Sequence, residues 1–314
     1  MAADIYSRFQ CAKDIIDECD HVLGGGLKDI MFTGPNDRLT MTANAQPAIL
    51  CHSIALLRVM QHEFGFDVSK SSFALGHSLG EYSALVATES ISLVDAIKLV
   101  RLRGEAMQTS VSDKKTSMRA LMINNGYLED VEALMKKIEM VIPDGEIAEI
   151  ANINSRSQVV ISGSTKGVDY ACSIIQAKGF AGRALPLPVS APFHCSLMLP
   201  AANQLRPHLE ATKFKEPCIE VISNFTGRPF ENSSQIGPYL YEQISKTVKW
   251  QQSVAYAREN DFVDEWIAIG PSKVLSNLIR REYPVDRVRS VSDVKDLEAF
   301  GVAVKDDKWD SYYL

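Results

Sequence analysis

The chain has 314 residues, of which 46% are hydrophobic and 23% are charged, close to the averages of soluble globular proteins. This length allows one large domain or two smaller ones, and it can bury a sizeable core without metal or disulfide staples. The composition excludes a disordered, collagen-like or membrane-spanning chain, and the formal net charge of −6 does not favour nucleic acid as a partner.

The N-terminal part of the chain alternates between helical and extended patterns. Apolar residues recur at helical spacing over residues 5–23 until a glycine triplet at 24–26 ends the pattern. A second helix is predicted over 48–64. A short apolar strand at 72–75 then leads through a glycine-bracketed turn into a helix of small residues from Tyr82. This order predicts an α/β unit.

Residues 117–187 have a different rhythm, which predicts strands at 118–123, 149–153, 158–163 and 183–187 and helices at 128–138 and 168–178. The order β-α-β-β-α-β is that of a ferredoxin-like subdomain. Further along, strands at 219–223 and 266–269 and a helix at 250–259 resume the α/β alternation. We therefore expect a discontinuous α/β domain of residues 1–116 and 188–314, with residues 117–187 inserted in it.

The strongest chemical signal is the G-x-S-x-G motif of residues 76–80, which lies between a predicted strand and a predicted helix. That context is the one a nucleophile elbow requires. The flanking Gly76 and Gly80 would allow a cramped turn. The turn would place the Ser78 hydroxyl at a helix N-terminus, where the N–H of Leu79 favours an oxyanion. The alternative is a tight turn in which the serine only caps the helix.

An activated serine needs a base, and six histidines are available. His77 is adjacent to Ser78, so its side chain points away from the hydroxyl. His194 lies in the irregular segment 189–195, and bases are often found in such segments. From the residues alone, a base and a hydrogen-bonded core histidine both remain open for His194. Surface or packing roles suffice for the remaining four, His21, His52, His62 and His208.

Arg103 lies on the apolar stripe of a predicted helix that a capping-box-like Ser92-x-x-Asp95 opens. A buried charge needs a partner, because burying it unpaired is expensive. The partner is either a core carboxylate, in a structural ion pair, or the carboxylate of a substrate, which a guanidinium can hold with two hydrogen bonds.

Several segments together resemble one family, the malonyl-CoA:acyl carrier protein transacylases. Residues 76–85 (GHSLGEYSAL) resemble its serine motif, and residues 102–108 (LRGEAMQ) its arginine motif. Residues 185–198 (LPLPVSAPFHCSLM) resemble its histidine motif. Two C-terminal signatures are similar at 248–250 and 269–275. The resemblance runs from the first helix to about Val291.

The resemblance implies a parallel-sheet, α/β-hydrolase-like core with the ferredoxin-like insert. It implies transfer of a malonyl group from malonyl-CoA to the phosphopantetheine thiol of acyl carrier protein, through a ping-pong reaction that supplies fatty acid synthesis. Ser78 would be the nucleophile and His194 the base. Arg103 would hold the malonyl carboxylate, and the Leu79 amide would donate to the oxyanion. The backbone carbonyl of Gln243 would orient the histidine in place of an aspartate.

Further residues match the family less specifically. Phe193 fits its malonyl-type pattern, while Gln46 and Asn154 match residues near its pocket. The acidic carrier protein could meet Lys273, Arg280 or Arg281, although a solvated basic face is the simpler interpretation.

One departure from the family leaves two alternatives open. Family members usually begin with a strand ending in F-P-G-Q-G, which supplies a second oxyanion donor, whereas this chain opens with the following helix. We therefore also consider a weakly active or non-catalytic truncated form that binds acyl carrier protein. The second alternative is a serine hydrolase or thioesterase on the same elbow, with an acid such as Asp169 completing its triad.

We expect no metal, cofactor, nucleic acid or membrane partner and a monomeric chain. The six scattered cysteines lack metal-ligand or paired spacing, which favours reduced thiols. The N-terminus has the features of neither a signal nor a transit peptide. These observations favour a soluble intracellular protein, in a bacterial cytoplasm or a mitochondrial matrix. The segment 306–314 extends past the family resemblance.

Overall fold

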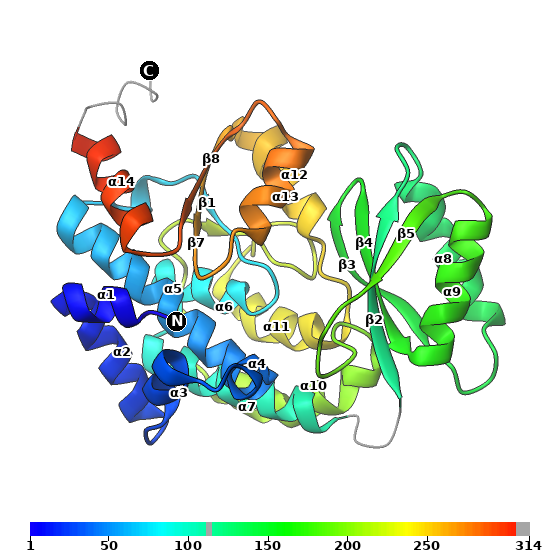
Figure 1. The fold of residues 1–314 in the computed structure, drawn as a ribbon, viewed down its shortest axis with the longest axis horizontal. Helices are drawn as coiled ribbons and strands as arrows, with labels where there is room; N and C mark the ends of the chain where they lie inside the picture. The colour runs from blue at the N-terminus through cyan, green and yellow to red at the C-terminus, as the bar shows by residue number, and fades with distance from the viewer. Residues whose placement is uncertain (111–114, 306–314) are drawn as a thin grey trace. The chain divides into compact units, whose positions relative to one another are not determined.

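The computed structural model describes residues 1–110 and 115–305 of a mixed α/β protein (Figure 1). The chain divides into two compact units. Unit 1 contains residues 1–101, residues 215–221 and the chain from Asp261 onward, whereas unit 2 contains residues 102–214 and 222–260. Within the described ranges, no helix is long and apolar enough to cross a membrane.

Unit 1 begins with five helices: α1 (Ala3–Arg8), α2 (Gln10–Val22), α3 (Leu27–Thr33), α4 (Asn36–Thr40) and α5 (Thr42–Phe64). The single helix predicted over 5–23 is therefore wrong in one respect. Phe9 adopts an extended conformation, with φ −120° and ψ 123°, and it separates α1 from α2. Apolar periodicity continues through this residue, so the spacing of hydrophobic residues did not reveal the break.

The predicted start of the second helix was also wrong, because α5 begins at Thr42 and contains Pro47. A proline inside a helix cannot donate to the carbonyl four residues earlier, which here is that of Ala43. The guanidinium of Arg101 donates to the Ala43 oxygen at 2.7 Å instead. A side chain from a distant part of the sequence thus satisfies the carbonyl that the proline leaves without its helical partner.

The strands of unit 1 form two separate parallel pairs in the part of the chain that the structure describes. Phe73–Ala74 (β1) pairs with Glu220–Val221 (β6), and Glu265–Ile269 (β7) pairs with Arg287–Val291 (β8). The strand predicted over 219–223 is thus only two residues long. The other helices of the unit are α6 (Gly80–Ala87), α13 (Val274–Glu282) and α14 (Val294–Lys305). The α14 helix packs on α5, where the rings of Phe300 and Phe64 meet edge to face.

Unit 2 contains one antiparallel sheet in the order β3-β4-β2-β5. The strands are β2 (Thr116–Ile123), β3 (Ala148–Ser155), β4 (Gln158–Ser164) and β5 (Ala181–Pro186). The chain follows β2 with α8 (Leu128–Val141) and β4 with α9 (Thr165–Ala177), and both helices cover the same face of the sheet (Figure 1). Buried residues such as Leu121, Val131, Ile161 and Cys172 form the core between sheet and helices.

The remaining helices include α7 (Leu93–Thr109), which continues from unit 1 into unit 2, and α10 (Leu199–Ala211), α11 (Ile236–Ser245) and α12 (Trp250–Asp261). Val248, between α11 and α12, is bound to the sheet. Its N–H donates to the Ala151 carbonyl at 2.8 Å, and its carbonyl accepts from Ile153 at 3.0 Å. The end of α11 is therefore fixed to β3 by backbone hydrogen bonds.

Candidate active site

The G-x-S-x-G segment forms a sharp turn between β1 and α6. Ser78 has a φ of +54°, a left-handed conformation that is uncommon outside glycine. The turn is closed by two hydrogen bonds, from the Gly80 N–H to His77 O at 2.9 Å and from the Glu81 N–H to Ser78 O at 3.1 Å. Strained backbone of this kind persists where the surrounding structure holds it, commonly at functional sites.

The two glycines of the motif are not equivalent. A Cβ on Gly76 would lie 2.0 Å from the carbonyl oxygen of Gly80, a separation that no side chain tolerates. A Cβ on Gly80 would meet no atom within 4 Å. The sequence-based expectation that both glycines relieve a Cβ clash is therefore wrong for Gly80. The close approach occurs at Gly76, because its α-carbon faces the first peptide of α6.

Leu79 lies just before the first residue of α6 and is 8% exposed. In the described ranges no acceptor is found for its backbone N–H. The first N–H groups of a helix have no intrahelical partner and carry the positive end of the helix dipole. An anion at this turn would therefore find a donor at Leu79, and Ser78 precedes it directly.

His194 is buried, at 4% exposure, and also has a left-handed backbone, with φ +59°. Its Nδ1 lies 2.7 Å from the backbone carbonyl oxygen of Gln243. Gln243 lies in the last turn of α11, where carbonyl groups have no partner within the helix. A carbonyl only accepts, so Nδ1 carries a proton and Nε2 is the nitrogen that can accept one.

Arg103 lies on α7 and is 1% exposed. Its Nη2 donates to the side-chain Oε1 of Gln243 at 2.8 Å. Gln243 thus contacts two of the predicted site residues through different groups. The structure brings Arg103, His194 and Gln243 together within unit 2.

The other predicted residues have local contacts. In unit 1, Gln46 is buried on α5 and its Nε2 donates to Thr42 Oγ1 at 2.9 Å. In unit 2, Asn154 donates to Gln158 Oε1 at 3.0 Å across the β3–β4 turn. Phe193 packs on the sheet face opposite α8 and α9, where Met118, Ala120, Ala151 and Val160 are buried.

Two of the three basic residues predicted to meet a carrier protein have partners within unit 1. Lys273 lies 3.5 Å from Asp296, and the Arg280 guanidinium donates to the Val288 carbonyl at 2.6 Å. The described structure gives no hydrogen bond or ion pair for Arg281.

Asp169, the acid considered for a hydrolase triad, forms an ion pair with Arg119 at 2.5 Å. The Nδ1 of His194, which a triad acid would have to contact, is already bonded to Gln243 O. Both contacts count against the triad.

Sequence reasoning missed the contact between the Gln243 side chain and Arg103. The two residues are 140 positions apart, and nothing local to either one indicates the pairing. The unusual backbone of His194 was also missed, whereas the G-x-S-x-G motif did indicate a strained turn at Ser78.

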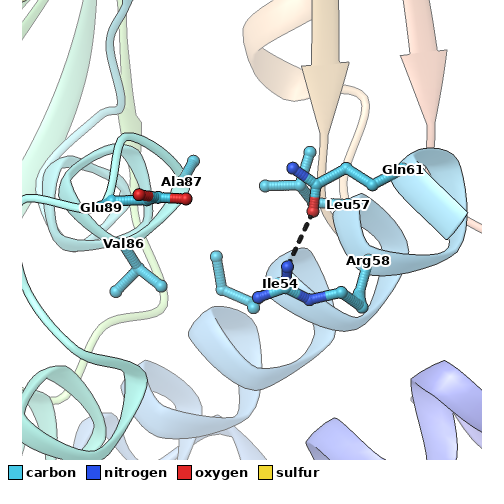
Figure 2. Close-up of a pocket in the computed structure, with 7 residues that line it drawn as sticks. All are labelled: Ile54, Leu57, Arg58, Gln61, Val86, Ala87 and Glu89. Atoms are coloured by element: carbon cyan, nitrogen blue, oxygen red, sulfur yellow. Dashed lines mark hydrogen bonds between the residues drawn. The ribbon is translucent and has the colours of Figure 1, made fainter. Parts of the chain in front are cut away.

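Two features lie outside these residues. A small hollow in unit 1 is lined by α5 and the end of α6, and none of the predicted site residues lines it (Figure 2). Its rim carries Arg58, which donates to Gln61 Oε1 at 3.1 Å, and Glu89. Among the described residues, one group could supply metal ligands: Cys11, His62 and Glu63, whose ligand atoms lie within 4.8 Å of one another.

Comparisons with known proteins agree across the chain. Residues 1–309 match the family described as the acyl transferase domain. The malonyl CoA-acyl carrier protein transacylase of Bacillus subtilis (strain 168) is 38% identical over 302 residues, covering 95% of this chain and 90% of that protein. The protein of the same name from Escherichia coli (strain K12) is 36% identical over 281 residues, covering 90% and 87%.

Solved structures are also similar to this chain over nearly its whole length. The acyl-carrier-protein-S-malonyltransferase from Bartonella henselae superposes with a TM-score of 0.88 at 38% identity, covering 97% of this chain and 95% of that one. A malonyl-transacylase in complex with its type II PKS acyl-carrier protein gives a TM-score of 0.86 at 35% identity, covering 95% and 93%.

Proposed function

Because the chain belongs to the acyl transferase domain family, we propose that it transfers a malonyl group from malonyl-CoA to acyl carrier protein, supplying fatty acid synthesis. The names of its relatives in Bacillus subtilis and Escherichia coli support this donor and this acceptor. The observation that carries the proposal is the buried arrangement in unit 2. There His194 is bonded to a backbone carbonyl, and Arg103 is bonded to a neutral amide of the same residue.

In the first half-reaction, Ser78 Oγ attacks the thioester carbon of malonyl-CoA while its proton passes to Nε2 of His194. The oxygen of the tetrahedral intermediate accepts from the Leu79 N–H. The intermediate then collapses. The C–S bond breaks, the coenzyme A sulfur takes the proton from His194, and malonyl-Ser78 remains.

In the second half-reaction, the phosphopantetheine thiol of acyl carrier protein gives its proton to His194 and attacks the malonyl ester. The ester C–O bond breaks, and Ser78 Oγ takes the proton back. Each half-reaction therefore begins and ends with a neutral imidazole. The steps require no metal ion or cofactor beyond the phosphopantetheine of the partner.

Substrate selection is assigned to Arg103. Its guanidinium would hold the malonyl carboxylate with two hydrogen bonds, an arrangement that a planar fork of donors favours. Holding the far end of the acyl group also fixes its thioester carbon for attack. Gln46, Phe193 and Asn154 are proposed to line the acyl pocket.

The finer architecture also belongs to this proposal. Residues 117–187 are proposed as a ferredoxin-like subdomain inserted in an α/β-hydrolase-like core of residues 1–116 and 188–314. The antiparallel order β3-β4-β2-β5, with both helices on one face, supports the subdomain. The relatives in Bacillus subtilis and Escherichia coli are bacterial proteins, which favours a bacterial cytoplasm over a mitochondrial matrix as the place of the reaction.

The proposal is tested by intact-protein mass spectrometry after brief incubation with malonyl-CoA. We expect a single malonyl adduct on the parent chain and none on Ser78→Ala. Addition of holo acyl carrier protein should then remove the adduct from the enzyme and place it on the carrier. A folded parent chain without an adduct would contradict the proposal and leave a non-catalytic protein. Release of the adduct to water rather than to the carrier would indicate a hydrolase.

A further inference from the structure

His194 is bonded to the backbone carbonyl of Gln243, whereas the side chain of Gln243 is bonded to Arg103. We propose that its amide is a positioning group for Arg103, which orients the guanidinium without neutralising its charge and thereby sets the preference for a carboxylated acyl group. This inference rests on the proposed function, because it concerns how the same site selects its substrate.

The contact is well defined by burial and distance. Gln243 is 0% exposed, Arg103 is 1% exposed, and Nη2 and Oε1 lie 2.8 Å apart. A hydrogen bond between buried groups is stronger than one in water, because the local dielectric is lower. A long arginine side chain has many rotamers, and ordering it beforehand removes part of the entropy lost on binding.

The chemical type of the acceptor matters as much as its place. An amide oxygen is a neutral acceptor, so it does not compensate the positive charge of Arg103. A carboxylate at the same place would pair with the guanidinium and compensate that charge. It would also compete with the substrate carboxylate. A glutamine is therefore suited to orient an arginine that also has to bind an anionic ligand.

The two contacts of Gln243 can be separated by substitution. His194 Nδ1 is bonded to the backbone carbonyl, which any residue at this position retains. Arg103 is bonded to the side chain, which a substitution removes or alters. Changes at Gln243 should therefore affect acyl selectivity and leave the backbone hydrogen bond of His194 in place.

The test compares malonyl-CoA with acetyl-CoA as donors in single-turnover acylation of Ser78 by the full chain. For Gln243→Glu we expect kcat/KM with malonyl-CoA to fall about 10–100-fold, because the new carboxylate would compensate the charge of Arg103 and compete with the substrate carboxylate. With acetyl-CoA the loss in kcat/KM should be at least about tenfold smaller than with malonyl-CoA, because acetyl has no carboxylate for Arg103 to hold. Gln243→Met should show the same sign with a smaller loss.

Two controls distinguish this role from a general effect on the fold. Gln204→Glu makes the same chemical change on an exposed residue of α10 and should alter neither donor. In an Arg103→Ala background, Gln243→Met should cause no further loss with malonyl-CoA, because the amide acts through the arginine. The pH profile with acetyl-CoA should be unchanged in Gln243→Met.

The outcomes separate the two proposals. The positioning role would be overturned if kcat/KM fell equally with malonyl-CoA and acetyl-CoA. It would also be overturned if the losses caused by Gln243→Met and Arg103→Ala added up in the double variant. Either result would leave the proposed function standing. A parent chain that forms no malonyl adduct would overturn the proposed function, and the positioning role with it.

Discussion

Gln243 accepts from His194 Nδ1 through its backbone carbonyl, at 2.7 Å, in a buried environment. A carbonyl fixes the tautomer and the ring plane of the imidazole as well as a carboxylate would. It carries no full charge, however, so it stabilises the imidazolium less than an aspartate does. Such a base suits a reaction in which a thiol leaves, because the imidazolium has to form only briefly before it returns its proton.

His194 is expected to be required for acylation and not for folding. In His194→Ala we expect the rate of malonyl-Ser78 formation to fall about 10²–10⁴-fold, the usual contribution of a positioned base. The rate is measured by quenched-flow mass spectrometry, and circular dichroism checks the fold. A folded variant that acylates at the parent rate would show that another group takes the Ser78 proton.

Arg103 is expected to control selectivity more than rate. Arg103→Ala should reduce kcat/KM for malonyl-CoA at least about 100-fold, through loss of a bidentate charged contact. Acetyl-CoA should be affected far less. Arg103→Lys should recover only part of the loss, because an ammonium cannot make the paired contact. Equal effects on both donors would argue against a role in binding the carboxylate.

The two glycines of the elbow give a matched pair for stability. Gly76→Ala should destabilise the chain by several kcal/mol or distort the turn, because its Cβ would overlap the Gly80 carbonyl. Gly80→Ala should leave the melting temperature unchanged or slightly raised, since its Cβ has space and alanine favours a helix. Differential scanning calorimetry of both variants provides the measurement. Equal destabilisation would contradict the geometry of the turn.

His52 is expected to make the fold sensitive to mild acid. It lies on α5, 3% exposed, and neither ring nitrogen has a hydrogen-bond partner in the described part of the chain. Burial lowers its pKa from 6.5 to about 4, although the charges of Asp4 and Asp293 oppose this shift. Between about pH 6.5 and about pH 4, His52 is therefore protonated in the unfolded chain and neutral in the folded chain.

The sign of the effect follows from this difference in proton binding. Stability is lost as the pH falls from about 6.5 to about 4, by about 3 kcal/mol in total for a shift of this size. Urea unfolding at a series of pH values should show a shallower loss for His52→Leu than for the parent over this range. Parallel curves for the two proteins would show that His52 does not contribute to the pH dependence.

The cysteines are expected to differ in reactivity according to burial. All six are free, and burial raises the pKa of Cys172 and of Cys195 to about 11. Their thiolate fraction at neutral pH is therefore very small. Cys218 is exposed and should react first with iodoacetamide, as measured by peptide mass spectrometry over time. Early labelling of Cys195 would show that its surroundings open readily.

The sequence determined most of the local structure, because hydrophobic periodicity and turn residues act over a few positions. The elements between residues 116 and 186 lie within a few residues of their predicted bounds. The start of α5 is an exception with a tertiary cause, and the break at Phe9 is another exception. Pro47 is accommodated inside α5, where Arg101 donates to the carbonyl that the proline cannot reach. Phe9 interrupts a pattern that continues on both sides of it.

The G-x-S-x-G motif by itself identified Ser78 as a candidate, and the resemblance of contiguous motifs to one family identified His194 and Arg103. Only the tertiary structure decided what His194 and Arg103 contact. Their common partner lies 49 residues from His194 and 140 residues from Arg103. Helical and strand periodicity are set by neighbours along the chain. A hydrogen bond over such distances exists only once packing has fixed α7, α11 and the segment at His194 against one another.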